Sequence, residues 1–236
     1  MKKNIAIVLA AGQGSRMHSD KPKQYLLLSG KPVLFYCLET FEKSEVIDEI
    51  ILVTGAEEIE FCRTEIVEKY NIKKVSAIIA GGKERFHSVF CGLQEIKQGT
   101  EETFVFIHDG ARPFVSEEML KRAYEAVQKY EACVVGMPVK DTIKIADTDA
   151  FVRETPKRET VWQIQTPQVF SYPIVYAAYK KLLAMEQPYA TDDAMVVENM
   201  LSKRIRLVKG SYRNIKITTP EDMDIADIFL KTGKQH

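Results

Sequence analysis

The sequence predicts an α/β fold in which a mostly parallel β-sheet is covered by helices on both faces. Short runs of β-branched and apolar residues alternate with longer segments in which apolar residues recur every three to four positions. Hydrophobic residues make up 45% of the 236 residues and charged residues 28%, which is typical of a globular protein. The sequence has no internal repeat, low-complexity tract or flexible linker, so we expect one domain over residues 1–236.

The predicted strands and helices alternate through the first 137 residues. Apolar, β-branched runs predict buried strands at residues 5–9, 50–54, 75–80, 104–108 and 134–137. Helical periodicity predicts helices at residues 32–41, 57–70, 85–97 and 116–130. The first of these helices opens on Pro32, which fits the first position of a helix. Such an alternation is the arrangement that parallel neighbouring strands require.

The alternation breaks after Pro138. Residues 140–153 alternate polar and apolar side chains around the turn-like stretch 147–149, which predicts a β-hairpin with no place inside the sheet. We expect this hairpin to protrude as an arm at about residues 139–160. Beyond the arm, the patterns predict helices at residues 173–185 and 192–201, strands at 205–208 and 214–218, and a closing helix after Pro220.

The composition argues against several classes of function. Basic and acidic residues number 33 each, so the chain lacks the positive excess expected of a protein that binds nucleic acid or an anionic membrane. The longest apolar run, residues 5–11, is far too short to span a bilayer. The four cysteines have no C-x-x-C spacing and the histidines are scattered, so we expect reduced core thiols rather than zinc or disulfides, in a cytoplasmic protein.

A loop containing glycines and cations follows the first predicted strand. Gly12 and Gly14 lie where the chain must turn at the carboxyl end of that strand, where ligands bind in open α/β sheets. The dinucleotide-binding fingerprint would need a third glycine at Met17, and the phosphate-binding P-loop motif is absent. The loop supplies three cations instead: Arg16, Lys21 and Lys23. Such a loop suits a triphosphate, although an ordinary turn with solvated cations fits the same residues.

Two more polar loops come directly after predicted strands, at residues 81–85 and 108–113. Because the carboxyl ends of parallel strands share one edge of a sheet, these loops and the first one predict a common crevice. Asp109, beside a glycine, is a poor core residue and a good ligand for a polyol hydroxyl or for Mg2+. We interpret His108 as a strand-end residue with a satisfied ring rather than as a catalytic group.

Together with other motifs along the chain, these three loops resemble those of the 2-C-methyl-D-erythritol 4-phosphate cytidylyltransferases of the non-mevalonate isoprenoid pathway. The resemblance runs nearly end to end through the motifs L-A-A-G-x-G-x-R-M, P-K-Q-Y, G-G-x-E-R, H-D-x-A-R-P, P-V-x-D-T-I-K, T-P-Q, T-D-D-A and N-I-K-I-T-x-P-E-D. It implies a Rossmann-like α/β sheet with a hairpin arm. It also implies transfer of a cytidylyl group from CTP to the sugar-alcohol phosphate, with release of pyrophosphate.

The resemblance implies roles for individual residues. Arg16 and Lys23 would stabilise the transition state, whereas Arg158 and Lys216 would hold the attacking phosphate. The residues implied in binding CTP are Ala10, Ala11, Gly12, Gly14, Gly82 and Ser88. Those implied in the sugar-phosphate site are Asp109, Arg112, Thr142, Thr166 and Thr191. Without the resemblance, Ser88 and Thr142 would fit ordinary structural positions better.

The implied chemistry needs positive charge rather than a covalent nucleophile. A phosphate oxygen of the sugar alcohol attacks the α-phosphorus of CTP in line, so two anions must be brought together. This requires cations on both sides of the crevice and Mg2+, for which Asp109 is a candidate ligand. We therefore expect CTP as co-substrate and a divalent cation as cofactor.

The arm predicts a homodimer. A two-stranded hairpin is marginally stable alone, and its apolar residues Ile143, Ile145 and Phe151 need cover that a second copy of the arm would supply. The resemblance implies that Thr142 and Arg158 reach into the active site of the neighbouring subunit. An arm folded back onto its own chain is the alternative.

Three other functions remain open from the residues. The ribitol-5-phosphate cytidylyltransferases share the phosphate loops, and Gly110 stands where many methylerythritol enzymes carry alanine, although Ala111 favours the methylerythritol enzymes. An NAD-dependent oxidoreductase would need the missing third glycine. A nucleotide-binding regulatory module would be expected to lack cations on both sides of the crevice.

Overall fold

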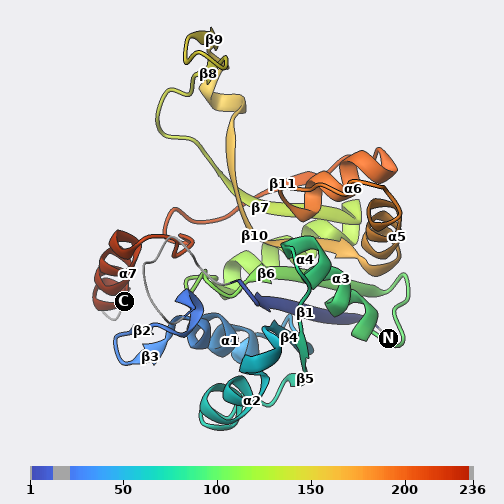
Figure 1. Cartoon of the computed structure of the whole chain (residues 1–236), viewed down its shortest axis with the longest axis vertical. Helices are drawn as coiled ribbons and strands as arrows, with labels where there is room; N and C mark the ends of the chain where they lie inside the picture. Colours follow the sequence, from blue (N-terminus) through green and yellow to red (C-terminus); the bar gives the residue numbers. More distant parts are fainter. Residues whose placement is uncertain (1, 13–21, 234–236) are drawn as a thin grey trace.

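A seven-stranded sheet forms the centre of the computed structural model, which describes residues 2–12 and 22–233 (Figure 1). In spatial order the strands are β11 (Arg206–Lys209), β7 (Ala132–Pro138), β10 (Trp162–Ser171), β6 (Thr103–Asp109), β1 (Lys3–Ala10), β4 (Glu49–Thr54) and β5 (Val75–Ala80). β1 pairs in parallel with β4 and β6, whereas β10 runs antiparallel to β6 and β7. The predicted mostly parallel sheet is confirmed, with β10 as a reversed strand inside it.

The middle strands are buried on both faces, which explains their nearly continuous apolar sequences. Ala6 and Val8 of β1 face one core cluster, and Ile5 and Ile7 face the other. The first cluster is covered by α1 (Val33–Lys43) and α4 (Glu117–Tyr130). The second is covered by α3 (Arg85–Glu95), α5 (Tyr172–Leu183) and α6 (Asp193–Leu201). Helices therefore cover both faces of the sheet, as predicted.

The helical segment predicted at residues 57–70 is present but is not one regular α-helix. It begins with a 3-10 turn, η3 (Ala56–Glu58), and continues through α2 (Ile59–Phe61) into a π-helical stretch, η4 (Cys62–Glu68). The helix predicted from Pro32 starts one residue later, because Pro32 pairs in a small hairpin of β2 (Leu27–Leu28) and β3 (Lys31–Pro32). β5 is an edge strand, so its residues are half-buried or exposed rather than buried as predicted.

β10 is a central strand that the sequence patterns did not predict. Its Pro167 cannot donate a ladder hydrogen bond, which normally argues against a central strand. The ladder with β7 shifts register between Ile164 and Gln168, and this irregularity accommodates the proline. The polar side chains of Gln165, Thr166 and Gln168 are at most 9% exposed, and all three hydrogen bond to neighbouring loops, to β6 or to α6.

The strand predicted at residues 214–218 is wrong. This segment joins no ladder and runs as irregular chain into the predicted closing helix, α7 (Pro220–Gly233). Ile217 N donates to Ala111 O at 2.8 Å, and the Ile217 side chain packs with Val33 and Ala226. The apolar residues that suggested a strand therefore fix this segment against the loop after β6 and against α7.

The hairpin predicted at residues 140–153 is present and stands away from the sheet as an arm (Figure 1). Its strands, β8 (Ile145–Ala146) and β9 (Val152–Glu154), pair antiparallel, and Asp147 Oδ1 accepts hydrogen bonds within the turn between them. The chain returns through η5 (Arg158–Thr160) into β10. Phe151 is 72% exposed and Val152 60% exposed, so the tip of the arm presents apolar surface.

The four cysteines are free, and Cys37, Cys62 and Cys133 are buried. Burial raises the pKa of the Cys37 and Cys133 thiols to about 12, so both remain protonated at neutral pH. These three side chains act as small apolar core residues. In the described part of the chain, no helix is long and apolar enough to cross a membrane.

Candidate active site

Three loops meet at the carboxyl ends of β1, β5 and β6. Leu9 lies opposite Asp109 in the β1–β6 register, and Gly110 N donates to Leu9 O at 2.9 Å. A Cβ on Gly110 would lie 2.8 Å from Leu34 Cδ1, which explains a glycine where the loop passes close to α1. On the other side of β1, Gly81 N donates to Thr54 O at 2.7 Å. The sheet thus brings the three predicted loops to one edge.

Gln24 holds the start of the first loop. Its Nε2 donates to Ala10 O at 2.5 Å and to Gly12 O at 3.1 Å, and the residue is 3% exposed. Gln24 belongs to the 3-10 turn η2 (Lys23–Tyr25), whose first residue is Lys23. The predicted residues Gly14 and Arg16 lie outside the described residues. Gln24 belongs to the P-K-Q-Y motif, but no local pattern predicts that its amide binds the loop after β1.

The predicted CTP residues Ala11, Gly82 and Ser88 lie together. Gly82 N donates to Ser88 Oγ at 3.1 Å, and Ser88 is only 4% exposed. A Cβ on Gly81 would lie 2.6 Å from Ser88 Oγ and 2.7 Å from Ala11 Cβ, so only a glycine lets these two loops approach so closely. Ser88 is therefore a buried residue of the loop junction and not a residue of the helix surface.

Asp109 is the centre of a cluster of three cations. Its Oδ1 lies 3.2 Å from Arg85 Nε, and its Oδ2 lies 2.8 Å from Lys216 Nζ and 3.9 Å from Arg112 Nε. Burial acts to raise the pKa of Asp109, but the charges of Arg85, then Lys216 and Arg112, hold it well below its usual range. The carboxylate is therefore ionised and surrounded by positive charge.

The loop after β6 and the backbone of β10 fix the segment that carries Lys216. Arg112 Nη1 donates to Asn214 O at 2.8 Å, and Asn214 Nδ2 donates to Thr166 O at 2.9 Å. Thr166 Oγ1 accepts from Asp109 N at 3.1 Å. The structure therefore brings four predicted residues of the sugar-phosphate site together: Asp109, Arg112, Thr166 and Lys216.

His108 is fully buried and hydrogen bonds through both ring nitrogens. Nε2 lies 3.1 Å from Arg112 O, and Nδ1 lies 3.1 Å from Thr166 Oγ1, which fits a neutral ring with its proton on Nε2. Burial, more than the nearby charges, lowers the pKa of His108 to about 4. The ring supports the loop after β6, as the sequence indicated.

This buried ring predicts a loss of stability in mild acid. The folded-state pKa of about 4 lies below the ordinary value near 6.5, so the unfolded chain takes up a proton first as the pH falls. The stabilisation is complete above about pH 6.5 and declines toward about pH 4. Between about pH 7.5 and pH 5, we expect His108 to cost about 2 kcal/mol of unfolding free energy. Urea unfolding of the native chain and of His108→Gln at both pH values measures this, and equal losses in both proteins would contradict it.

Three predicted site residues do not join this cluster within the chain. Thr142 and Arg158 are exposed on the arm, and Arg158 Nη1 donates to Lys140 O at 3.3 Å. Thr191 is exposed just before α6, with Oγ1 3.3 Å from Met195 Sδ. Arm residues can therefore serve a site of this kind only in a neighbouring molecule or after the arm moves.

The described residues do not form a resident Mg2+ site. No group of three or more His, Cys, Asp or Glu side chains that could hold a metal occurs among residues 2–12 and 22–233. Both oxygens of Asp109, the candidate ligand, face cations. Mg2+ commonly binds through one or two carboxylates together with substrate phosphates and water, and such a site is complete only when the triphosphate is present.

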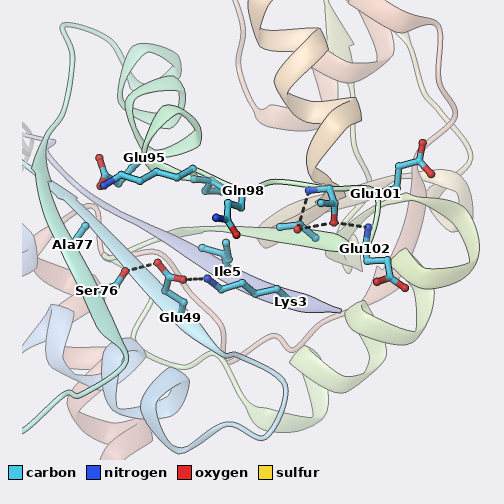
Figure 2. Close-up of a pocket in the computed structure, with 13 residues that line it drawn as sticks. Lys3, Ile5, Glu49, Ser76, Ala77, Glu95, Gln98, Glu101 and Glu102 are labelled. Atoms are coloured by element: carbon cyan, nitrogen blue, oxygen red, sulfur yellow. Dashed lines mark hydrogen bonds and ion pairs between the residues drawn. The ribbon is translucent and has the colours of Figure 1, made fainter. Parts of the chain in front are cut away.

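A cavity lies at the end of the sheet opposite to the three loops (Figure 2). Lys3 begins β1, Glu49 begins β4 and Thr103 begins β6, so this cavity of about 860 Å³ opens at the amino ends of the strands. Figure 2 shows Glu49 between Ser76 and Lys3, both of which it contacts. Three further glutamates line it, so it is a poor receptor for a triphosphate: Glu95, Glu101 and Glu102.

Comparison with known proteins gives consistent matches along the whole chain. The model of the family described as IspD, 2-C-methyl-D-erythritol 4-phosphate cytidylyltransferase, matches residues 4–232. A 2-C-methyl-D-erythritol 4-phosphate cytidylyltransferase from Lachnospira eligens is 54% identical over 97% of this chain and 99% of its own length. Another, from Caldanaerobacter subterraneus, is 46% identical over 96% of this chain and 98% of its own. The crystal structure of 4-diphosphocytidyl-2C-methyl-D-erythritol synthase from Anaerococcus prevotii aligns with a TM-score of 0.85 and 38% identity, over 98% of this chain and 96% of that one.

Proposed function

Because the chain belongs to the 2-C-methyl-D-erythritol 4-phosphate cytidylyltransferase family, it transfers the cytidylyl group of CTP to 2-C-methyl-D-erythritol 4-phosphate, and we propose that this transfer is a single in-line displacement. A phosphate oxygen of the sugar alcohol forms a bond to the α-phosphorus as the bond to the β-phosphate oxygen breaks. The products are 4-diphosphocytidyl-2-C-methyl-D-erythritol and pyrophosphate. The ribitol 5-phosphate alternative is not favoured, since the relatives are methylerythritol enzymes.

The observation that supports this site most directly is the cation cluster around Asp109 beside the Ala11–Gly82–Ser88 junction. CTP on one side and the sugar phosphate on the other would meet across this edge of the sheet. We propose that CTP is bound by the loop residues Ala10, Ala11, Gly12, Gly14, Gly82 and Ser88. Ala11 and Ser88 close in on Gly81 with short side chains, which would leave room for a pyrimidine.

The two anions must be neutralised from both sides. Lys23, held by its neighbour Gln24, and Arg16, beyond the described residues, are the proposed cations for the triphosphate. Lys216 is the proposed cation for the attacking phosphate, because its side chain is 38% exposed while its ammonium group is tied to Asp109. Asp109, Arg112, Thr166 and Thr191 would shape the pocket around the polyol. A divalent cation held by the CTP phosphates would offset part of their negative charge.

The arm supports a homodimer in which each site is completed by the partner. Its exposed Phe151 and Val152 need cover, and a second arm offers the same surface by two-fold symmetry. Thr142 and Arg158 would then reach the neighbouring Asp109 cluster, with Arg158 as the second cation on the attacking phosphate. We also propose that residues 1–236 work as one nucleotidyltransferase domain, and that the enzyme acts in the reducing cytoplasm, which its free cysteines suit.

A pyrophosphate-release assay tests the substrate assignment. With CTP, turnover should be far faster with 2-C-methyl-D-erythritol 4-phosphate than with ribitol 5-phosphate. ATP should be a much poorer donor, because a purine would leave backbone groups in the base pocket unpaired at about 1 to 3 kcal/mol each. Equal kcat/KM for CTP and ATP would show that the proposed pocket does not select the base.

A further inference from the structure

Arg85 and Asp193 have no role in the catalytic scheme, and their contact joins two sequence motifs, G-G-x-E-R and T-D-D-A. Arg85 Nη1 and Nη2 each lie 2.8 Å from one oxygen of Asp193. The Asp193 side chain is 0% exposed, so this is a two-point ion pair inside the protein. Paired N–H donors facing a carboxylate fix distance and orientation together, which a single ammonium group cannot do.

The same guanidinium also reaches the catalytic edge of the sheet. Arg85 Nε donates to Asp109 Oδ1 at 3.2 Å, while Lys216 Nζ lies 2.8 Å from Asp109 Oδ2. The two oxygens of Asp109 are therefore divided between Arg85, which is half-buried, and the lysine proposed to receive the substrate phosphate. Arg85 is the first residue of α3, which follows the Gly81–Gly82 loop. It therefore adjoins both the proposed CTP loop and the Asp109 cluster.

Asp193 is a fixed anchor for Arg85. Tyr179 OH donates to Asp193 Oδ1 at 2.5 Å. The start of α6 is bound to β10, because Gln168 Oε1 accepts from Ala194 N at 2.8 Å and Gln168 Nε2 donates to Asp192 Oδ2 at 3.0 Å. Asp193 therefore cannot shift without displacing α6 from the sheet. The ion pair with Asp193 in turn holds the Arg85 guanidinium in place.

We propose that Arg85 is a positioning residue of the acceptor site: held by Asp193, it fixes one oxygen of Asp109 so that the other oxygen holds Lys216 in place for the substrate phosphate. The inference rests on the roles proposed above for Asp109 and Lys216. When the phosphate arrives, Lys216 can turn toward it while Asp109 stays bound to Arg85. Without Arg85, the Asp109 carboxylate can move with Lys216 and compete with the substrate phosphate for the Lys216 ammonium group.

Arg85→Lys is the informative substitution. Arg85→Ala would leave Asp193 as an unpaired buried charge, and the chain would be expected to unfold. Lysine keeps the positive charge but cannot span two carboxylates. We expect Arg85→Lys to lower kcat/KM for 2-C-methyl-D-erythritol 4-phosphate by roughly tenfold to a hundredfold. The Kd for CTP, measured by titration without the acceptor, should change by less than about twofold, because the lost contact acts on the acceptor side.

A double-mutant cycle with Asp109→Asn separates positioning from general structural support. If Arg85 acts through Asp109, adding Arg85→Lys to Asp109→Asn should cost less than about twofold more in kcat/KM. Arg63→Lys is the matched control, since Arg63 pairs with Glu60 on the exposed face of the helical segment after β4. It should behave as the native enzyme in both assays.

Three outcomes would overturn the inference or its premise. Independent, multiplying effects of the two substitutions would show that Arg85 does not act through Asp109. A loss of CTP affinity as large as the loss in kcat/KM would mark Arg85 as a general structural residue. An Asp109→Asn enzyme with native kcat/KM would instead refute the proposed role of Asp109. If Arg85→Lys does not fold, Asp193→Asn, which keeps the side-chain shape beside Tyr179, enters the same cycle with the same expected values.

Discussion

Replacing Lys23 by alanine is expected to lower kcat for cytidylyl transfer by about a hundredfold or more. Lys23 begins η2, and its neighbour Gln24 is bound to Ala10 and Gly12 at the start of the triphosphate loop. A cation held in advance at the transferring phosphoryl group stabilises the charge of the transition state more than that of the bound substrates. The loss should therefore appear in kcat at saturating CTP and acceptor, measured by pyrophosphate release.

The matched control is Lys97→Ala. The Lys97 side chain is 84% exposed and belongs to the cavity at the amino ends of the strands, far from the catalytic edge. This variant should keep native kcat, and both variants should show native-like thermal unfolding. A Lys23→Ala enzyme with near-normal kcat would contradict the role of Lys23, as would a loss of activity explained by unfolding alone.

The parallel part of the sheet could be predicted from the sequence because burial on both faces leaves a simple signal. Residues of β1, β4 and β6 form apolar, β-branched runs with almost no polar interruption. Their order along the chain places three polar loops at one edge. The positions of Asp109 and Gly82 follow from that rule alone, before any side-chain contact is known.

β10 and the segment at residues 214–218 show where local patterns fail. β10 contains Pro167 and three polar residues that hydrogen bond to β6, to α6 and to the loop after β11, so its sequence does not look like a central strand. Ile215 and Ile217 have the spacing of a strand, but they pack against α7 and the small hairpin before α1. In both cases tertiary contacts outweigh the local propensity.

Contacts between side chains that are distant in sequence could not be predicted from local sequence patterns either. Arg85 and Asp193 are separated by 108 residues, and neither position shows that the two form an ion pair. Gln24 lies next to Lys23, but only the folded chain shows that its amide binds Ala10 O. The motifs drew attention to these residues, and the structure supplies the contacts from which their roles are argued.

Arg158→Ala is expected to lower kcat/KM for 2-C-methyl-D-erythritol 4-phosphate by about a hundredfold or more. Arg158 is exposed on the arm, and its guanidinium donates to Lys140 O within the same arm. Its proposed partner is the attacking phosphate in the neighbouring subunit, opposite Lys216. Arg153→Ala, on β9 of the same arm, is the control for effects of charge on the arm, and it should stay within about twofold of the native value. A native kcat/KM in Arg158→Ala would contradict the assignment.

Mixing two impaired chains tests most directly whether each active site is shared between subunits. Lys23→Ala and Arg158→Ala, each expected to lose about a hundredfold or more of the native activity alone, are combined in equal amounts under conditions that allow subunits to exchange. If Arg158 acts in the partner's site, each mixed dimer holds one site with both defects and one site with neither. Random exchange should then restore about one quarter of the native sites, measured as pyrophosphate release per chain. If Arg158 acts within its own chain, every site keeps one defect, so a mixture with no recovered activity despite proven exchange would contradict the shared site.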